Sequence, residues 1–234
     1  MSGDNVHKGH RARTKERFLS EGIDGFADHN VLELLLFYSV PQKDTNPVAH
    51  ALLDAFGSLH GVFDATHEEL CKIPGVGPES ATLIKLIPQL GRRYQISKVK
   101  NEKRLDSAAK AGAWLIPRFM GHRDEIVLCV CIDSKQMVLA CATLSEGTVN
   151  VAGLQARKVV EFALRHNAAN VILSHNHPSG IALPSQEDQM FTLKIKAALE
   201  AVGITLTDHI IVAGDDFVSM AQSGFFTNRR ERPI

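Results

Sequence analysis

The chain has 234 residues, 44% of them hydrophobic, and its 26 basic and 26 acidic side chains cancel to a formal net charge of zero. This composition excludes a disordered chain and leaves room for one large or two smaller folded domains. The charge balance removes bulk basicity as an argument for nucleic-acid binding, although a local basic patch could still hold phosphate.

The first residues, MSGDNVHKGHRARTKERF, lack the apolar core of a signal peptide. No segment approaches the roughly eighteen apolar residues of a membrane span. These features predict a cytoplasmic protein that has no membrane partner. A solvated, frayed N-terminus is the simpler explanation of the basic stretch from His10 to Arg17, which could otherwise supplement contacts with phosphate.

Short segments with helical periodicity follow from Val31 to about Tyr94. Apolar residues recur at helical spacing and β-branched runs are missing. These segments are VLELLLFY, PVAHALLDAF, HEELCKI and SATLIKLIPQLGRRY. We therefore expect a small all-α domain over residues 1–95.

The stretch IPGVGPESATLIKL places Gly75 and Gly77 in a tight turn before a helix that opens near Pro78. Glycines permit backbone conformations that other residues resist, and N–H groups at a helix start can hold a phosphate. The stretch resembles the helix-hairpin-helix element, which grips a nucleic-acid backbone without reading its sequence. A glycine-containing turn that merely joins two short helices explains the pattern equally well.

The polar stretch QISKVKNEKRLDS predicts a linker around Ile96 to Arg104, and the character of the chain changes beyond it. The runs EIVLCVCID and QMVLACATL predict two strands joined by a hairpin turn at SK, and NVILS and ITLTDHIIVA predict two more. Helical patterns lie between them in LQARKVVEFALRHN and SQEDQMFTLKIKAALEAVG, the latter stopped at Gly203. We therefore expect an α+β fold, with a mixed sheet flanked by helices over residues 105–234.

The fifteen residues SHNHPSGIALPSQED, from Ser174 to Asp188, follow the predicted strand NVIL and combine two histidines with two acids. In an extended chain His175 and His177 point to the same side, as two ligands of one ion must, and Asn176 faces away. A helix that begins at Ser185 could aim the carboxylate of Asp188 at the same point. Two imidazoles and a carboxylate leave a fourth position for water, as in catalytic zinc sites. An H-x-H pair alone is weak evidence, but the whole string is specific.

A purely structural explanation exists for part of this string. The segment SQED fits a helix capping box, with Ser185 as N-cap and Asp188 three residues later. Such a cap needs no metal, although one serine could serve both purposes.

The string HNHPSGIALPSQED resembles the JAMM metalloprotease motif. Together with NVILSHNHPSG, EGTVN and TDHIIVAGDDFVSM it resembles the RadC family of bacterial proteins, and the resemblance covers almost the whole chain. It implies a JAB1/MPN fold related to that of cytidine deaminases, and a zinc-dependent hydrolase. Deaminase activity itself is disfavoured, because the chain has neither the H-x-E nor the P-C-x-x-C that those enzymes need.

The resemblance also implies roles for further residues. The JAMM pattern supplies a glutamate from an early strand, and Glu125 matches that position as the base that takes a proton from a metal-bound water. Asp124 and Glu146 are the alternatives if the register differs. Ser185 is the implied group that steadies the oxyanion. We leave His209, in TDHIIV, out of the site because the ligand set is complete without it.

Two classes of function remain. The first is a zinc-dependent peptidase or isopeptidase that acts on an unidentified peptide or protein. The second is a DNA-associated protein, related to repair or recombination, in which the hydrolase domain is not the main activity. A combination, with the Gly75 to Gly77 hairpin recruiting the hydrolase to DNA, is also open. The sequence identifies neither the substrate nor the oligomeric state.

Overall fold

The structure is a computed structural model that describes residues 4–99, 103–146, 156–178 and 180–226. The chain forms two compact units, Met1–Gly91 and Arg92–Ile234, and the boundary falls inside one long helix, α6 (Pro78–Val99). Each unit has a hydrophobic core of its own. The linker expected from Ile96 begins too early, because α6 continues to Val99.

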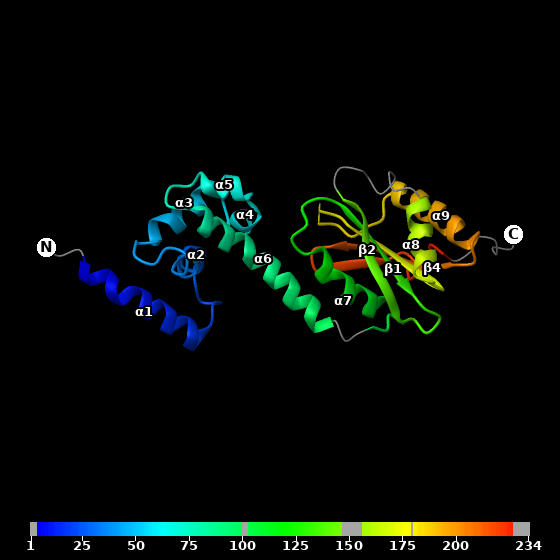
Figure 1. The fold of residues 1–234 in the computed structure, drawn as a ribbon, viewed down its shortest axis with the longest axis horizontal. Coiled ribbons are helices and arrows are strands. Elements are labelled where there is room, and N and C mark those ends of the chain that lie inside the picture. The colour runs from blue at the N-terminus through cyan, green and yellow to red at the C-terminus, as the bar shows by residue number, and fades with distance from the viewer. Residues whose placement is uncertain (1–3, 100–102, 147–155, 179, 227–234) are drawn as a thin grey trace. The chain divides into compact units, whose positions relative to one another are not determined.

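The first unit is entirely helical in its described residues (Figure 1). Its helices before α6 are α1 (Asp4–Glu21), α2 (Asp28–Leu36), α3 (Asn46–Phe56), α4 (Leu59–Asp64) and α5 (His67–Cys71). One buried leucine from each of α2, α3 and α5, namely Leu32, Leu52 and Leu70, meets Ile84 of α6 in the core. The helical segments expected from the apolar periodicity are therefore confirmed.

The basic N-terminal stretch is helical, so the expectation of a frayed terminus was wrong. Arg11 on α1 donates hydrogen bonds to the backbone carbonyls of Phe37 (3.3 Å) and Val40 (2.6 Å), and to that of Lys43. The Nε2 atom of His10 lies 3.0 Å from Oε1 of Glu33, which is fully buried in α2. These contacts order α1 because they satisfy carbonyls that follow the end of α2. They also engage one arginine that would otherwise be free for phosphate.

The glycine hairpin lies between α5 and α6. Gly75 has a φ of +89°, and a Cβ there would lie 2.7 Å from Cγ2 of Val48. A side chain at Gly75 would therefore suffer both backbone strain and a clash. Gly77 has open space around it and no such constraint.

The second unit contains a five-stranded mixed sheet with the strand order β2-β1-β3-β4-β5. Only the β3–β4 pair is parallel, and the other neighbouring strands pair antiparallel. The strands are β1 (Ile126–Ile132), β2 (Val138–Glu146), β3 (Asn170–Asn176), β4 (Thr205–Ala213) and β5 (Asp216–Ser219). A hydrogen bond from the Gln136 N–H to the Asp133 carbonyl closes the turn between β1 and β2 around the expected SK pair.

Helices cover both faces of this sheet (Figure 1). Helix α7 (Ala108–Phe119) packs on one face, and α8 (Ala156–Arg165) and α9 (Gln186–Glu200) pack on the other. Alternate residues of β1 enter the two cores, so the whole strand is buried and reads as a continuous apolar run. This arrangement confirms the expected α+β fold, with its mixed sheet flanked by helices. No helix among the described residues is both long and apolar enough to cross a membrane.

Candidate metal centre

Strand β3 carries the two histidines of the motif to one end of the sheet. Val171 and Leu173 face the core under α8 and α9, so by alternation His175 lies on that side as well. The His177 N–H donates to the Val212 carbonyl at 2.8 Å, which keeps the chain extended one residue past the strand. The two imidazoles therefore share one side, as the H-x-H spacing predicts.

The first turn of α9 brings the carboxylate. Ser185 caps the helix: its Oγ accepts the Asp188 N–H (3.1 Å), and the Ser185 N–H donates to Oδ2 of Asp188 (2.8 Å). The predicted capping box is thus confirmed. The Ser185 hydroxyl also donates to Oδ2 of Asp188 at 2.7 Å, so the cap fixes the carboxylate as well as the helix start.

The three side chains converge. Nε2 of His175 lies 2.9 Å from Nε2 of His177 and 3.2 Å from Oδ1 of Asp188, and Nε2 of His177 lies 3.5 Å from Oδ2 of Asp188. A tetrahedral zinc ion with bonds of about 2.0 to 2.1 Å separates its ligand atoms by about 3.3 Å. The donor set and its spacing therefore fit zinc.

The electrostatics of the cluster favour positive charge beside Asp188, whether histidine protons or a metal ion supply it. Burial alone would raise the pKa of Asp188, but hydrogen bonds with His175 and His177 outweigh burial and hold that pKa well below its usual range. The hydrogen bond with Asp188 raises the pKa of His177 above its usual value, although partial burial opposes the shift. The carboxylate is thus ionised at neutral pH and supplies a negative charge to the site.

The cluster opens toward one side. The side chain of His175 is 0% exposed and that of Asp188 5%, whereas His177 is 17% and Glu125 is 29% exposed. The cluster is therefore accessible from the side of His177 and Glu125.

A backbone carbonyl orients His177. Its Nδ1 lies 2.9 Å from the carbonyl oxygen of Ile181. A carbonyl can only accept, so Nδ1 carries a proton, and Nε2 is the nitrogen that can bind a metal ion once the proton that it shares with Asp188 is released. This is the usual arrangement of a metal-binding histidine.

Glu125 immediately precedes β1, and its Oε1 lies 4.0 Å from Nε2 of His175. Asn176 lies behind this segment: its Oδ1 accepts the Ile126 N–H (2.8 Å) and its Nδ2 donates to the Asp124 carbonyl (3.1 Å). One buried amide therefore holds the backbone on both sides of Glu125, and Asn176 faces away from the histidine pair as predicted.

The two alternative acids differ in how far the structure describes them. Asp124 is exposed. Glu146 ends β2 and pairs with Ile126 across the strands, but its side chain and the following GTVN segment lie outside the described residues. Of the candidate bases, Glu125 is the one whose described side chain lies close to the histidines.

His209, which sequence reasoning left out, lies directly behind the cluster. Its Nε2 is 2.8 Å from Nδ1 of His175, on the side of that ring away from His177 and Asp188. Its ring is fully buried, and burial lowers its pKa well below the usual value. The polar pair DH directly before the apolar run IIVA of β4 was the available signal, because a buried histidine needs a partner.

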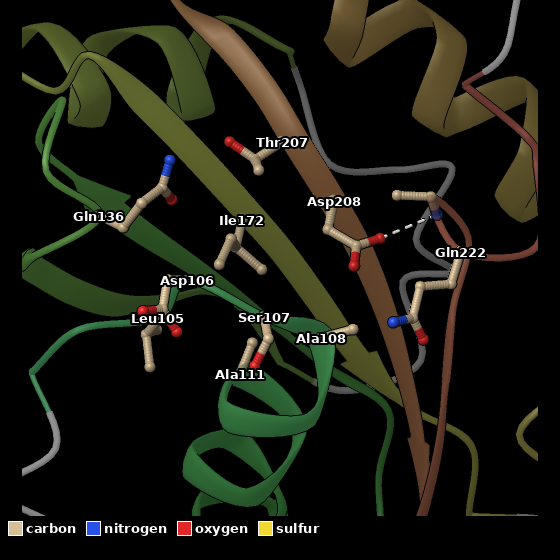
Figure 2. A pocket seen from close by; sticks show the side chains of 11 residues that line it. Leu105, Asp106, Ser107, Ala108, Ala111, Gln136, Ile172, Thr207, Asp208 and Gln222 are labelled. Carbon is tan, nitrogen blue, oxygen red and sulfur yellow. Dashed lines mark hydrogen bonds between the residues drawn. The ribbon is translucent and has the colours of Figure 1, made fainter.

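A cavity of about 260 Å³ lies on the opposite face of the sheet, beside the start of α7 (Figure 2). Ile172 of β3 and Thr207 and Asp208 of β4 contribute to its wall. None of the predicted site residues is among those that line it. The convergent polar groups of the motif and this cavity are therefore separate features.

Comparisons with known proteins agree with this architecture. A family model described as RadC-like JAB domain matches residues 105–225, and a helix-hairpin-helix motif matches residues 58–87. A UPF0758 protein of Nitrosococcus oceani is 35% identical over 212 residues, which cover 91% of this chain and 95% of that protein. A UPF0758 protein of Fusobacterium nucleatum is 33% identical over 225 residues, which cover 93% and 97%. The chain therefore belongs to the RadC family, with a JAB domain in its second unit and a helix-hairpin-helix motif in its first.

Proposed function

We propose that the chain is a zinc-dependent peptidase or isopeptidase. The convergence of His175, His177 and Asp188 at distances that suit one zinc ion is the observation that carries this proposal. Nε2 of each histidine and one carboxylate oxygen would hold the metal. Zinc, when bound, would supply a Lewis acid that lowers the pKa of coordinated water toward about 7.

Glu125 is the proposed general base. Its carboxylate stands at the open side of the cluster, close enough to reach a water beside His175 but outside the group of three ligand atoms. It would take a proton from the attacking water and return that proton to the leaving amine nitrogen. Asn176 serves this step by fixing the backbone that carries Glu125.

Ser185 has two proposed tasks. Its hydroxyl already holds Oδ2 of Asp188 at 2.7 Å, which orients a ligand. To steady an oxyanion as the family resemblance implies, the hydroxyl would have to turn away from Asp188 while a substrate is bound. The first task needs no such movement.

Hydrolysis of a mixed peptide library tests the proposal. We expect the zinc-loaded chain to cleave amide bonds, a chelator to stop the cleavage and added zinc to restore it. Cleavage that continues in the chelator, or no cleavage by zinc-loaded protein across the library, would contradict the proposal.

We propose, as a second function, that the first unit contacts the nucleic-acid backbone. The match to the helix-hairpin-helix motif over residues 58–87 favours it. The N–H groups at the start of α6, next to Gly77, are the proposed phosphate contacts. Such a contact would be indifferent to base sequence and would weaken steeply with salt.

A further inference from the structure

A chain of short contacts runs from the back of His175 to the first turn of α9. Nδ1 of His175 lies 2.8 Å from Nε2 of His209, and Nδ1 of His209 lies 2.5 Å from Oγ1 of Thr192. The same Oγ1 lies 2.5 Å from the backbone carbonyl oxygen of Asp188. His175, His209 and Thr192 are all 0% exposed, so bulk solvent does not reach these contacts.

A bulge in β4 turns His209 toward this position. Val171 of β3 pairs with Leu206 of β4, but the next residue, Ile172, pairs with Asp208, so Thr207 is the extra residue. Leu206 faces the core under α8 and α9, whereas Ile210 faces the α7 core, so the bulge reverses the alternation of β4. His209 consequently lies on the side of His175, and Asp208 on the opposite side.

Hydrogen bonds stabilise the bulge at Asp208, whereas the buried hydroxyl of Thr207 destabilises it. The Asp208 carboxylate accepts hydrogen bonds from the N–H groups of His209 (2.8 Å) and Ala221 (3.0 Å) and from the Ser219 hydroxyl (2.6 Å). The buried Oγ1 of Thr207 has no hydrogen-bond partner among the described residues. Bulges in general are over-represented at sheet edges and next to active sites, where they re-aim a side chain.

The donor and the acceptor in each of these contacts follow from the last contact of the series, which is made by the Asp188 carbonyl. The Asp188 carbonyl can only accept, so the Thr192 hydroxyl spends its single proton on it. Oγ1 of Thr192 must then accept, which requires a proton on Nδ1 of His209. Burial disfavours a second ring proton on His209, so its Nε2 is left as an acceptor, which requires a proton on Nδ1 of His175.

We propose that His209 and Thr192 are positioning residues that keep a proton on Nδ1 of His175, so that Nε2 is the nitrogen that binds metal. This inference rests on the proposed zinc site and deepens it. His177 keeps its Nδ1 proton directly through the Ile181 carbonyl, whereas His175 keeps its own through two intervening side chains. The chain of contacts also ties one ligand to another, because it ends on the backbone of Asp188.

The tautomer of His209 is the first test. In the full-length protein with ¹⁵N-labelled histidine, the His209 signals are assigned by their loss in His209→Gln. We expect a protonated Nδ1 and a bare Nε2 on His209, both in chelated and in zinc-treated protein. A proton on Nε2 of His209 would overturn the proposal.

Zinc affinity of a matched pair of variants is the second test. Thr192→Val keeps the shape of the side chain but removes the hydroxyl, and Thr192→Ser keeps the hydroxyl but removes a methyl group. Loss of a partner behind a metal-binding histidine typically weakens metal binding by about 10- to 100-fold. We expect that loss for Thr192→Val, with a zinc dissociation constant close to wild type for Thr192→Ser.

The two tests separate this inference from the proposed hydrolase. Equal zinc affinity in Thr192→Val and wild type would overturn the positioning role, even if hydrolysis is observed. If the wild-type chain binds no zinc, the proposed hydrolase is wrong. The hydrogen-bond directions are tested separately, by the proton positions on the His209 ring in chelated protein. If Thr192→Val does not fold, the His209 tautomer measured in wild-type protein still tests the proposed hydrogen-bond directions.

Discussion

The glycine hairpin of the helical unit and the histidine cluster of the sheet unit differ in how far packing accounts for them. Gly75 is required by its positive φ and by the proximity of Val48, whatever else the hairpin does. The capping box accounts for Asp188, but no comparable structural need explains why two imidazoles meet its carboxylate in a largely buried site.

The two motifs differ in their effect on the free energy of folding. A glycine at a left-handed turn lowers strain and is retained for stability alone. Buried ionisable groups lose hydration, and replacing such groups with apolar residues is often neutral or stabilising. A motif that packing explains is therefore weak evidence of function, and one that packing does not explain is stronger evidence.

Removal of both histidines should produce the largest effect. We expect His175→Ala combined with His177→Ala to lower zinc from about one ion per chain to none, and hydrolysis to background, because only one ligand remains. Elemental analysis measures this. His60→Ala, at a side chain that is 85% exposed, is the control and should keep its zinc. Unchanged zinc content in the double variant would mean that the two histidines are not ligands. The histidine cluster would then be no stronger evidence of function than the glycine hairpin.

Substitution of the proposed base should separate catalysis from metal binding. We expect Glu125→Gln to keep zinc while hydrolysis falls by roughly 10² to 10⁴ fold, the usual contribution of a positioned base. Asp188→Asn should lose zinc and activity together, because a neutral amide holds the ion less strongly than a carboxylate. Parallel zinc analysis and kinetics of the two variants measure this. If Glu125→Gln loses metal as readily as Asp188→Asn, Glu125 is a ligand or a structural residue.

A charge at the hairpin should have the smallest effect. Gly77 has open space around it, so Gly77→Glu and its neutral control Gly77→Gln should both fold. If the hairpin holds phosphate, the added negative charge should weaken DNA binding about fivefold relative to Gln, as expected for unit charges about 4 Å apart in water. Fluorescence anisotropy with the full chain, over a range of salt concentrations, measures this. Equal affinities would leave the hairpin as a structural joint.

The sequence was informative where local patterns determine the structure. The capping box at Ser185 and Asp188 and the shared side of His175 and His177 follow from spacing along one helix turn and one strand. Helix α7 was missed, although Ser107 as N-cap and the spacing of Ala111, Trp114 and Leu115 could have predicted it.

Other features depend on contacts that the sequence does not encode locally. The helix over His10 to Arg17 is ordered by carbonyls beyond α2, which are distant in the chain. The position of His209 depends on the bulge at Thr207, and one extra residue reverses the face of every later side chain in a strand. Periodicity alone could not show that His209 lies behind His175.

Anomalous X-ray scattering from crystals of the full chain, recorded on either side of the zinc absorption edge, tests the central claim most directly. We predict one zinc peak per chain, between Nε2 of His175, Nε2 of His177 and the carboxylate of Asp188. A zinc peak elsewhere, or no zinc peak at these three side chains in zinc-treated crystals, would contradict the account.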